Sequence, residues 1–292
     1  MLRRPTPRRW LAAALAAVAG LATAAVAVIW QSPADAAAIP QYDHVIVVVL
    51  ENHGYPQVIG DPAAPYLTSL AFGGARLKSF YAITHPSQPN YFALFSGSTQ
   101  SVIGDMCPAA DWPLDKPNLA QELLAAGHTW GSYNEGLPEQ GSTVCGDGAT
   151  GYARKHNPWF AFSNVPASTG HTFGQFPADY TQLPTVSFVV PNQCNDMHSC
   201  PVATGDTWVR DNLSAYAAWA RTHNSLLIVT ADEDNGFYFN RIPVIFYGAH
   251  VRTGWFNGLY THYNLLRTLE DMYGTSHAGN AATTRPITET WE

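Results

Sequence analysis

Residues 45–53 read VIVVVLENH, a run of six apolar residues that ends abruptly in polar ones. Six residues are too few for an independent helix, and an uninterrupted β-branched run is typical of a strand buried on both faces of a parallel sheet. Similar runs recur later in the chain, at residues 185–190 (TVSFVV), 226–230 (LLIVT) and 242–247 (IPVIFY). We therefore expect a central, mostly parallel β-sheet that contains residues 45–50.

Helical patterns alternate with these strands, at residues 65–72, 119–126, 207–222 and 263–273. Their ends carry the usual helix signals, because Asn118 and Asp206 are suitable N-caps and Gly127 and Gly274 follow two of the C-termini. The alternation of strand and helix predicts an α/β fold in which helices cover both faces of the sheet.

The first 38 residues have the form of an export signal. Four arginines within residues 3–9 precede an apolar run that extends to Trp30, and residues 34–36 (ADA) offer a cleavage site. The apolar run is longer than that of most signal peptides, so an uncleaved membrane anchor is the alternative. In both cases we expect residues 39–292 to form a single domain that is secreted or extracytoplasmic.

The charge of the chain excludes some classes of partner. Its 292 residues include 15 Lys and Arg against 22 Asp and Glu, which gives a formal charge of −7. We expect such an acidic protein to bind neither nucleic acid nor an anionic membrane by charge alone. The sequence also lacks the motifs GxxxxGK[ST], HExxH and GxSxG, which argues against P-loop, zincin and α/β-hydrolase chemistry. No protein partner is predicted.

All four cysteines follow the predicted leader. An even number of cysteines in an exported chain favours disulfide bonds over thiol catalysis. Of the three pairings, we favour Cys107 with Cys145 and Cys194 with Cys200. The alternative is a zinc site formed by Cys194, His198 and Cys200, which oxidising surroundings disfavour.

Acidic residues follow three of the predicted strands. They are Glu51 with Asn52 after the first strand, Asp196 after the second, and Asp232 with Glu233 after the third. In open α/β sheets, ligands bind at the edge where the carboxyl ends of the strands meet. So many oxygen donors in one crevice would repel one another unless a cation lay among them. The sequence therefore predicts a divalent-cation site at this edge.

A proline-rich segment, residues 84–91 (THPSQPNY), places Ser87 before an apolar stretch. With Pro89 as the first helical residue, Ser87 would lie just before a helix N-terminus, where free N–H groups favour an alkoxide or a phosphate. A serine beside a cation is a candidate nucleophile, and a plain helix-capping loop is the alternative. Residues 154–156 (RKH) add three cationic side chains that suit phosphate oxygens. His262, which opens the last predicted helix after a strand, is a further candidate for the same crevice.

Together these segments resemble the bacterial phosphoesterase family of secreted acid phosphatases and phospholipases C. The resemblance is carried, in chain order, by VVVLEN at residues 47–52, THPSQPNY at 84–91, YARKHNP at 152–158, NDMH at 195–198, TADED at 230–234 and THY at 261–263. It is greatest to secreted acid phosphatases of the phosphatidylinositol 3-phosphatase type. It implies an alkaline-phosphatase-like three-layer sandwich with one phosphoesterase domain in residues 39–292.

The resemblance also implies roles for individual residues. Ser87 would accept the phosphoryl group. The implied metal ligands are Glu51, Asn52, Ser87, Asp232 and Glu233. A second ion, where relatives bind one, corresponds to Asp196, His198 and His262. The expected substrate-binding residues are Asn52, Lys155, His156 and His198. Of these, His156 and His198 are also expected to be catalytic, with His198 as the acid for the leaving group. One or two divalent ions are expected, and the donors suit Mg, Ca, Mn, Zn or Fe.

The expected reaction is a two-step hydrolysis of phosphomonoesters, with phosphoinositides among the candidate substrates, through a phosphoserine at Ser87. Protonated His156 and His198 would favour an acid pH optimum. Two other functions stay open: a phosphodiesterase of the phospholipase C type, and a non-catalytic surface protein that binds phospholipid. The expected partner is a small-molecule or lipid phosphomonoester, and membrane contact is expected only through the substrate or an uncleaved leader.

Overall fold

Strand β1, His44–Leu50, lies inside the central sheet, as its apolar run predicts. It pairs in parallel with β7 (Val186–Val190) on one side and with β8 (Ser225–Ala231) on the other. Apart from the first residue of β1, all three strands are buried along their whole length. Burial on both faces explains why these strands lack the alternation of apolar and polar residues that a half-exposed strand shows.

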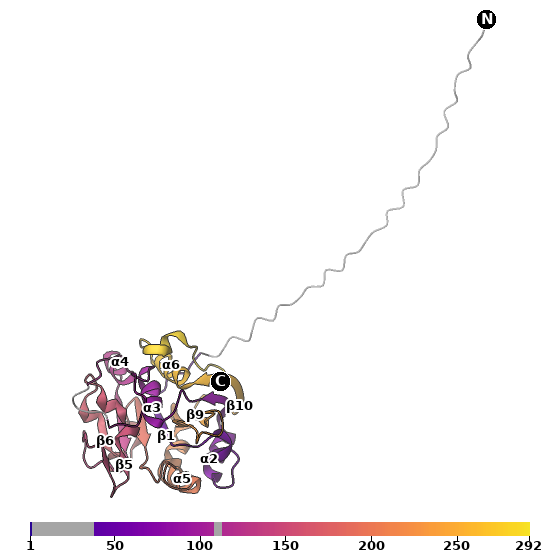
Figure 1. The fold of residues 1–292 in the computed structure, drawn as a ribbon. Helices are drawn as coiled ribbons and strands as arrows, with labels where there is room; N and C mark the ends of the chain where they lie inside the picture. The colour runs from indigo at the N-terminus through magenta and orange to yellow at the C-terminus, as the bar shows by residue number, and fades with distance from the viewer. Residues whose placement is uncertain (2–37, 108–112) are drawn as a thin grey trace. The chain divides into compact units, whose positions relative to one another are not determined.

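The sheet has eight strands in the order β10-β2-β9-β8-β1-β7-β3-β6 (Figure 1). Strand β9 (Val244–Gly248) runs antiparallel to both of its neighbours, and every other pair in the sheet is parallel. The mostly parallel sheet that we expected is therefore confirmed. Three strands escaped prediction because polar residues interrupt their apolar pattern or because they are short: β2 (Ala75–Tyr81), β3 (Trp130–Asn134) and β6 (Gly170–Thr172). Strand β10 (Gly254–Thr261) leads into His262.

Helices cover both faces of the sheet and make a three-layer sandwich (Figure 1). One face carries α2 (Pro65–Gly73) and α5 (Val202–Ala220), and the other carries α3 (Ser87–Ser96), α4 (Leu119–Ala125) and α6 (His262–Tyr273). Alternate residues of β1 face opposite layers: Val45, Val47 and Val49 join the second group of helices, and Ile46, Val48 and Leu50 join the first. The short helix α1 (Tyr55–Val58) follows β1.

Two helices begin earlier than the sequence indicates. Helix α5 starts at Val202, so Asp206 is not its N-cap. Instead the buried Asp206 carboxylate accepts hydrogen bonds from the backbone N–H groups of Tyr66 and Leu67, at 3.2 and 2.7 Å, in the first turn of α2. Helix α3 starts at Ser87 rather than at Pro89, and Pro89 is tolerated there because the first-turn N–H groups have no intrahelical partner.

Both favoured disulfides are present, Cys107–Cys145 and Cys194–Cys200. A zinc site at Cys194 and Cys200 is thereby excluded, because both sulfur atoms are used in the bond. Between β3 and β7 the chain forms a hairpin of two short strands, β4 (Gly146–Asp147) and β5 (Tyr152–Ala153). The short 3-10 turns are Arg154–His156, Pro158–Ala161, Ala167–Thr169, Phe173–Gln175, Tyr180–Gln182 and Gly279–Thr283.

The computed structural model describes residues 1, 38–107 and 113–292. The predicted leader is residues 1–38, and only residues 1 and 38 of it are among the described residues. Its predicted cleavage site lies outside them. Residues 38–107 and 113–292 belong to one compact unit. Across residues 38–107 and 113–292, no helix has the length and apolar character that crossing a bilayer requires.

Replacing Asp206 tests its role as a long-range cap. We expect Asp206→Ala to lower the free energy of unfolding by about 2–3 kcal/mol, because two helix N–H groups lose a charged acceptor in a buried place. In a protein of this size that is a fall of roughly 4–12 °C in Tm, measurable by circular dichroism. Asp211→Ala, at an exposed position on the same helix, should change Tm by less than about 2 °C. Equal Tm values for the two variants would contradict the assignment.

Candidate active site

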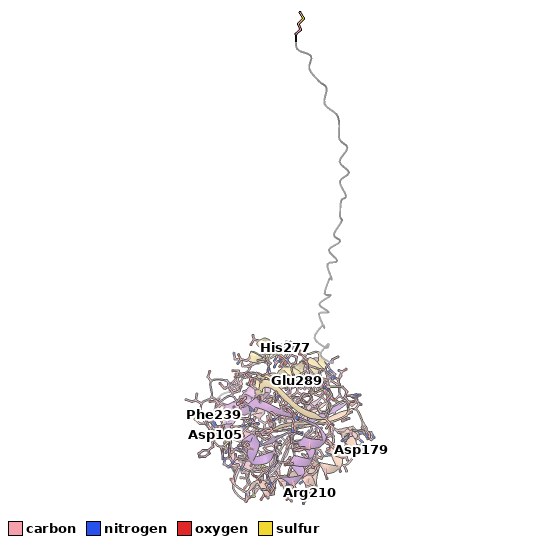
Figure 2. The ribbon with its side chains drawn as sticks, turned by 90° about the vertical axis from the view of Figure 1, so that its right-hand side faces the viewer. Asp105, Asp179, Arg210, Phe239, His277 and Glu289 are labelled. Atoms are coloured by element: carbon pink, nitrogen blue, oxygen red, sulfur yellow. A yellow bond between two sulfur atoms is a disulfide. The ribbon has the colours of Figure 1, made fainter. Side chains whose placement is uncertain are left out.

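The polar residues that follow β1, β7 and β8 meet at one edge of the sheet. Backbone hydrogen bonds join them, from Asp232 N to Leu50 O at 3.0 Å and from Glu51 N to Asp196 O at 2.7 Å. Asp105 belongs to this edge. Figure 2 shows it on the side of the molecule opposite Asp179, which precedes β7 in the chain. The carboxyl ends of the parallel strands therefore collect the candidate site residues, as predicted.

Ser87 is the first residue of α3 and lies among the carboxylates. Its Oγ atom is 3.0 Å from Glu51 Oε2 and 3.2 Å from Glu233 Oε1, and its side chain is buried. A hydroxyl has one proton, so it donates to only one of these two acceptors at a time. The serine is thus held between two groups that can accept its proton.

Five carboxylates are buried at this edge: Glu51, Asp196, Asp232, Glu233 and Asp234. The Asp234 oxygens accept backbone N–H groups of residues 236, 238 and 240, so this residue holds its own loop. By contrast, Asp232 Oδ2 and Asn52 Oδ1 have no hydrogen-bond partner among the described residues. Buried oxygens without partners are costly unless a cation or a donor meets them, and this donor set is the one that hard divalent cations prefer. The residues present therefore fit a divalent ion.

The pKa values of the carboxyl groups in the cluster also favour a bound cation. Burial, together with the Glu233 charge, raises the pKa of Asp232 to about 8. Burial likewise raises the pKa of Glu233 and that of Asp196 to about 7, and it raises the pKa of Glu51 well above its ordinary value. Each shift records the cost of a negative charge that has been removed from water and placed near others.

Three nitrogen-bearing side chains lie next to Glu51 and Asp196. The two ring nitrogens of His156 lie 3.1 Å from Asp196 Oδ2 and 3.3 Å from Glu51 Oε1. His198 is held by its backbone N–H, which donates to Asp196 Oδ1 at 2.8 Å, and its Nε2 lies 3.5 Å from Lys155 Nζ. Glu51, His156 and His198 each offer an atom within 4.8 Å of the others, a second arrangement that could hold a metal ion.

The charges of these side chains differ from our expectation. Burial, with the Lys155 charge nearby, lowers the pKa of His156 to about 3, and the same two causes lower the pKa of His198. The neutral imidazole is therefore favoured at both residues, whereas we expected imidazolium at mildly acid pH. Burial also disfavours the Lys155 ammonium, but the hydrogen bond and charge of Asp105 outweigh it and raise the pKa of Lys155. Lys155 is thus the cation of this group.

His262 occupies a different place from the other residues of the expected second metal site. Its Nε2 lies 2.6 Å from the backbone oxygen of Asp232, while Asp196 contacts His156 and His198. Burial lowers the pKa of His262 to about 4, which leaves it a neutral donor to that oxygen. The structure brings Asp196 and His198 together and directs His262 to the backbone behind Asp232.

Three residues that contact the site were missed in the sequence. His85 Nδ1 lies 2.5 Å from Glu233 Oε2, the Tyr91 hydroxyl donates to Glu51 Oε1, and Asp105 binds both Lys155 Nζ at 2.8 Å and the backbone N–H of Gln88 at 3.0 Å. Tyr91 could have been found, because it lies four residues after Ser87 and so on the same helix face. Asp105 lies in a loop without any periodic signal.

Comparison with known sequences places this site in a family. The sequence model of the Phosphoesterase family matches residues 61–276. The chain belongs to this family. The chain is 48% identical to the phosphatidylinositol-3-phosphatase of Mycobacterium tuberculosis over 294 aligned residues, 99% of this chain and 97% of that protein. It is 30% identical to the phosphate-repressible acid phosphatase of Penicillium chrysogenum, of which it spans 60%.

Solved structures agree on the fold of this phosphoesterase. A protein of the alkaline phosphatase superfamily from Vibrio parahaemolyticus superimposes with a TM-score of 0.60 at 13% identity, over 85% of this chain and 71% of that chain. The lipoteichoic acid synthase LtaP from Listeria monocytogenes gives a TM-score of 0.56 at 10% identity, over 87% of this chain and 75% of that chain. The expected family and the alkaline-phosphatase-like α/β fold are both confirmed.

Removing one buried charge tests the electrostatic cost of the site. A carboxyl whose pKa is raised on folding contributes stability at low pH that is lost as pH rises towards the folded pKa, here about 8 for Asp232. We therefore expect Asp232→Asn, with a chelator present, to raise Tm at pH 8.5 by several degrees and to leave it almost unchanged at pH 4, as scanning calorimetry would measure. Glu139→Gln, at an exposed position, is the matched control. A lower Tm for Asp232→Asn at pH 8.5 would refute the argument.

Proposed function

We propose that this chain is a metal-dependent phosphomonoesterase in which Ser87 accepts the phosphoryl group. The observation that carries the proposal is the position of Ser87 Oγ at the start of α3, 3.0 Å from Glu51 and 3.2 Å from Glu233. Family membership supports the reaction class, and the curated relatives named above are both phosphatases. Those names favour monoesters over the diesters that a phospholipase C would cleave.

The residues that would hold the ion are Glu51, Asn52, Ser87, Asp232 and Glu233. When bound, a divalent cation would offset the buried negative charge, lower the pKa of the serine hydroxyl and balance charge on the phosphoryl oxygens. The support comes from the unpartnered oxygens of Asn52 and Asp232 and from the raised pKa of Asp232.

In the first step Ser87 Oγ attacks phosphorus. The hydroxyl proton passes to Glu51 or Glu233, the bond from Oγ to phosphorus forms, and the bond from phosphorus to the alcohol oxygen breaks. The partial positive charge at the N-terminus of α3 favours both the alkoxide and the phosphoryl oxygens. The Gln88 N–H already donates to Asp105, and Pro89 has no N–H, so the backbone contributes there mainly through this charge. The phosphoserine is then hydrolysed by water, which restores the hydroxyl.

The alcohol leaves towards Lys155 and His198. In an in-line displacement the leaving oxygen lies opposite the attacking one. Glu51 connects the two groups, because its Oε2 lies 3.0 Å from Ser87 Oγ and it offers an atom within 4.8 Å of one on His198, which lies 3.5 Å from Lys155 Nζ. The Lys155 ammonium supplies positive charge to the departing oxygen, and His198 relays a proton to it. His156, neutral and fixed between Glu51 and Asp196, orients the carboxylate that faces the serine.

The comparison supports a substrate class, and the sequence and the disulfides support a place of action. A relative that is 48% identical along nearly the whole chain is named for a phosphoinositide, so a lipid or small-molecule phosphomonoester is the proposed substrate. Export is supported by the form of residues 1–38 and by two disulfides, which persist in oxidising compartments.

The nucleophile is tested by Ser87→Ala. We expect kcat to fall by about three orders of magnitude or more, because the variant lacks the attacking oxygen, while Tm changes little. Ser96→Ala, a buried serine at the other end of the same helix, should retain activity. Wild-type protein quenched in acid during turnover should carry phosphate on the peptide that contains Ser87, as mass spectrometry would detect. Near wild-type turnover by Ser87→Ala would reject the nucleophile.

The metal and the reaction class are tested together by chelation. We expect EDTA to abolish phosphate release from p-nitrophenyl phosphate and readdition of one divalent cation to restore it, since the carboxylates alone repel the phosphate dianion. Release of p-nitrophenol only from bis(p-nitrophenyl) phosphate would assign a diesterase instead. Full activity after exhaustive chelation would reject metal dependence.

A further inference from the structure

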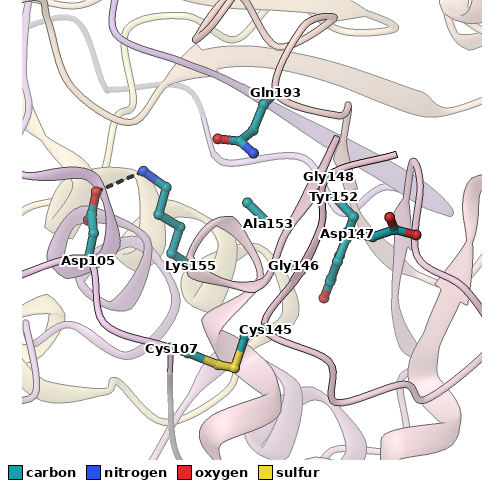
Figure 3. A pocket seen from close by; sticks show the side chains of 10 residues that line it. All are labelled: Asp105, Cys107, Cys145, Gly146, Asp147, Gly148, Tyr152, Ala153, Lys155 and Gln193. Atoms are coloured by element: carbon teal, nitrogen blue, oxygen red, sulfur yellow. Dashed lines mark hydrogen bonds and ion pairs between the residues drawn. A yellow bond between two sulfur atoms is a disulfide. The ribbon is translucent and has the colours of Figure 1, made fainter. Parts of the chain in front are cut away.

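A cavity of about 420 Å³ lies beside the candidate active site. Figure 3 shows the Cys107–Cys145 disulfide at one end of it, Gln193 at the other, and Lys155 along one wall, where it reaches Asp105. The volume is within the range of small-molecule sites, about 300–1,000 Å³.

The cavity adjoins the catalytic centre, because two of its lining residues, Lys155 and Asp105, contact residues of that centre. Lys155 Nζ lies 3.5 Å from His198 Nε2, on the side where the alcohol leaves. Asp105 Oδ1 accepts the backbone N–H of Gln88, the residue after Ser87, at 3.0 Å. A phosphoester at Ser87 whose leaving oxygen faces Lys155 would therefore place its alcohol portion in this cavity.

The walls are fixed before any ligand arrives. The disulfide joins the segment of Asp105 to the β4–β5 hairpin, and backbone hydrogen bonding joins that hairpin to Gln193, whose N–H donates to Gly151 O at 2.9 Å. Asn192 Nδ2 adds a bond to Thr150 O at 3.0 Å. A preformed site of this kind selects its ligand by shape and by hydrogen bonds instead of adapting to it.

The lining exposes polar and apolar surface in similar amounts, and its polar groups have spare hydrogen-bonding capacity. Among the described residues that line the cavity there is no Val, Leu, Ile, Met, Phe or Trp. The Gln193 amide makes no hydrogen bond to a described residue, Asp147 uses one oxygen on Ala149 N and keeps the other, and the Lys155 ammonium has three donors. An amide and a carboxylate together offer both donors and acceptors, which is what hydroxyl groups require.

We propose that this cavity binds the alcohol portion of the substrate and selects hydroxyl-rich alcohols, cyclic polyols or sugars, with Gln193 as a specificity-determining residue. The proposal rests on the phosphomonoesterase function proposed above. It adds the chemical class of the leaving group and names Gln193 as the residue that recognises it. A free polyol phosphate and a phosphoinositide headgroup share this chemistry.

Gln193→Leu tests the proposal, because it keeps the size of the side chain and removes its donor and acceptor. We expect kcat/KM for myo-inositol 1-phosphate to fall about tenfold, mainly through KM, and kcat/KM for p-nitrophenyl phosphate to change less than twofold. Gln193→Ala, which introduces no new bulk, should shift the ratio in the same direction. Gln182→Leu, at an exposed position near the start of β7, is the matched control and should leave the ratio unchanged.

Phosphatidylinositol 3-phosphate in phosphatidylcholine vesicles distinguishes the two sources of the polyol. A similar loss on vesicles and on the soluble phosphate supports recognition of the polyol itself, whereas a loss on vesicles alone would overturn the proposal. Equal losses on inositol phosphate and p-nitrophenyl phosphate, or none, would also overturn it while leaving the phosphomonoesterase function intact. Absence of phosphate release from every monoester by the wild-type protein would reject both.

Discussion

The burial of five carboxylates at one edge of the sheet is the constraint on which the rest of the site depends. A lone buried carboxylate costs several kcal/mol, and neighbours of the same charge add to the cost. The cluster persists because β1, β7 and β8 are parallel, buried and adjacent, so each strand delivers its acidic residue to the same place. The raised pKa values of Asp196, Asp232 and Glu233 reflect the electrostatic cost of burying these carboxylates.

The side of the site that carries Lys155 and His198 is positioned by a different kind of interaction. Lys155 lies in the 3-10 turn after β5, and His198 lies in the loop after β7. Cys107–Cys145 ties the segment of Asp105 to the hairpin that precedes Lys155, and Cys194–Cys200 closes the loop that carries His198. Strand pairing thus places Glu51, Asp232 and Glu233, whereas the disulfides hold the segments next to Asp105 and around Asp196 and His198.

Positions that depend on the neighbouring sequence could be predicted from the residues themselves. Side-chain contacts between residues far apart in the chain could not. Glu51, Asp232 and Glu233 follow apolar strands directly, so the parallel sheet alone places them. Asn118 caps α4 as predicted, since a cap and its helix are local. Asp206 and Asp105 escaped because their partners, at Leu67 and Lys155, are 139 and 50 residues away. Strand β2 escaped for a related reason: tertiary pairing, not its own composition, makes it a strand.

The position of His156 bears on which of its neighbouring carboxyl groups carries a proton. Its ring nitrogens lie next to Asp196 on one side and Glu51 on the other, and a neutral imidazole has only one N–H to donate. The hydrogen bond of the ring is the one between Nδ1 and Asp196, because Nε2 has no hydrogen-bond partner among the described residues. Asp196, whose pKa burial raises to about 7, is already protonated below neutral pH and can donate to Nδ1, which leaves Nε2–H facing Glu51. Carboxyls must lose such protons before they bind a cation, so the burial that creates the site also ties cation binding to pH.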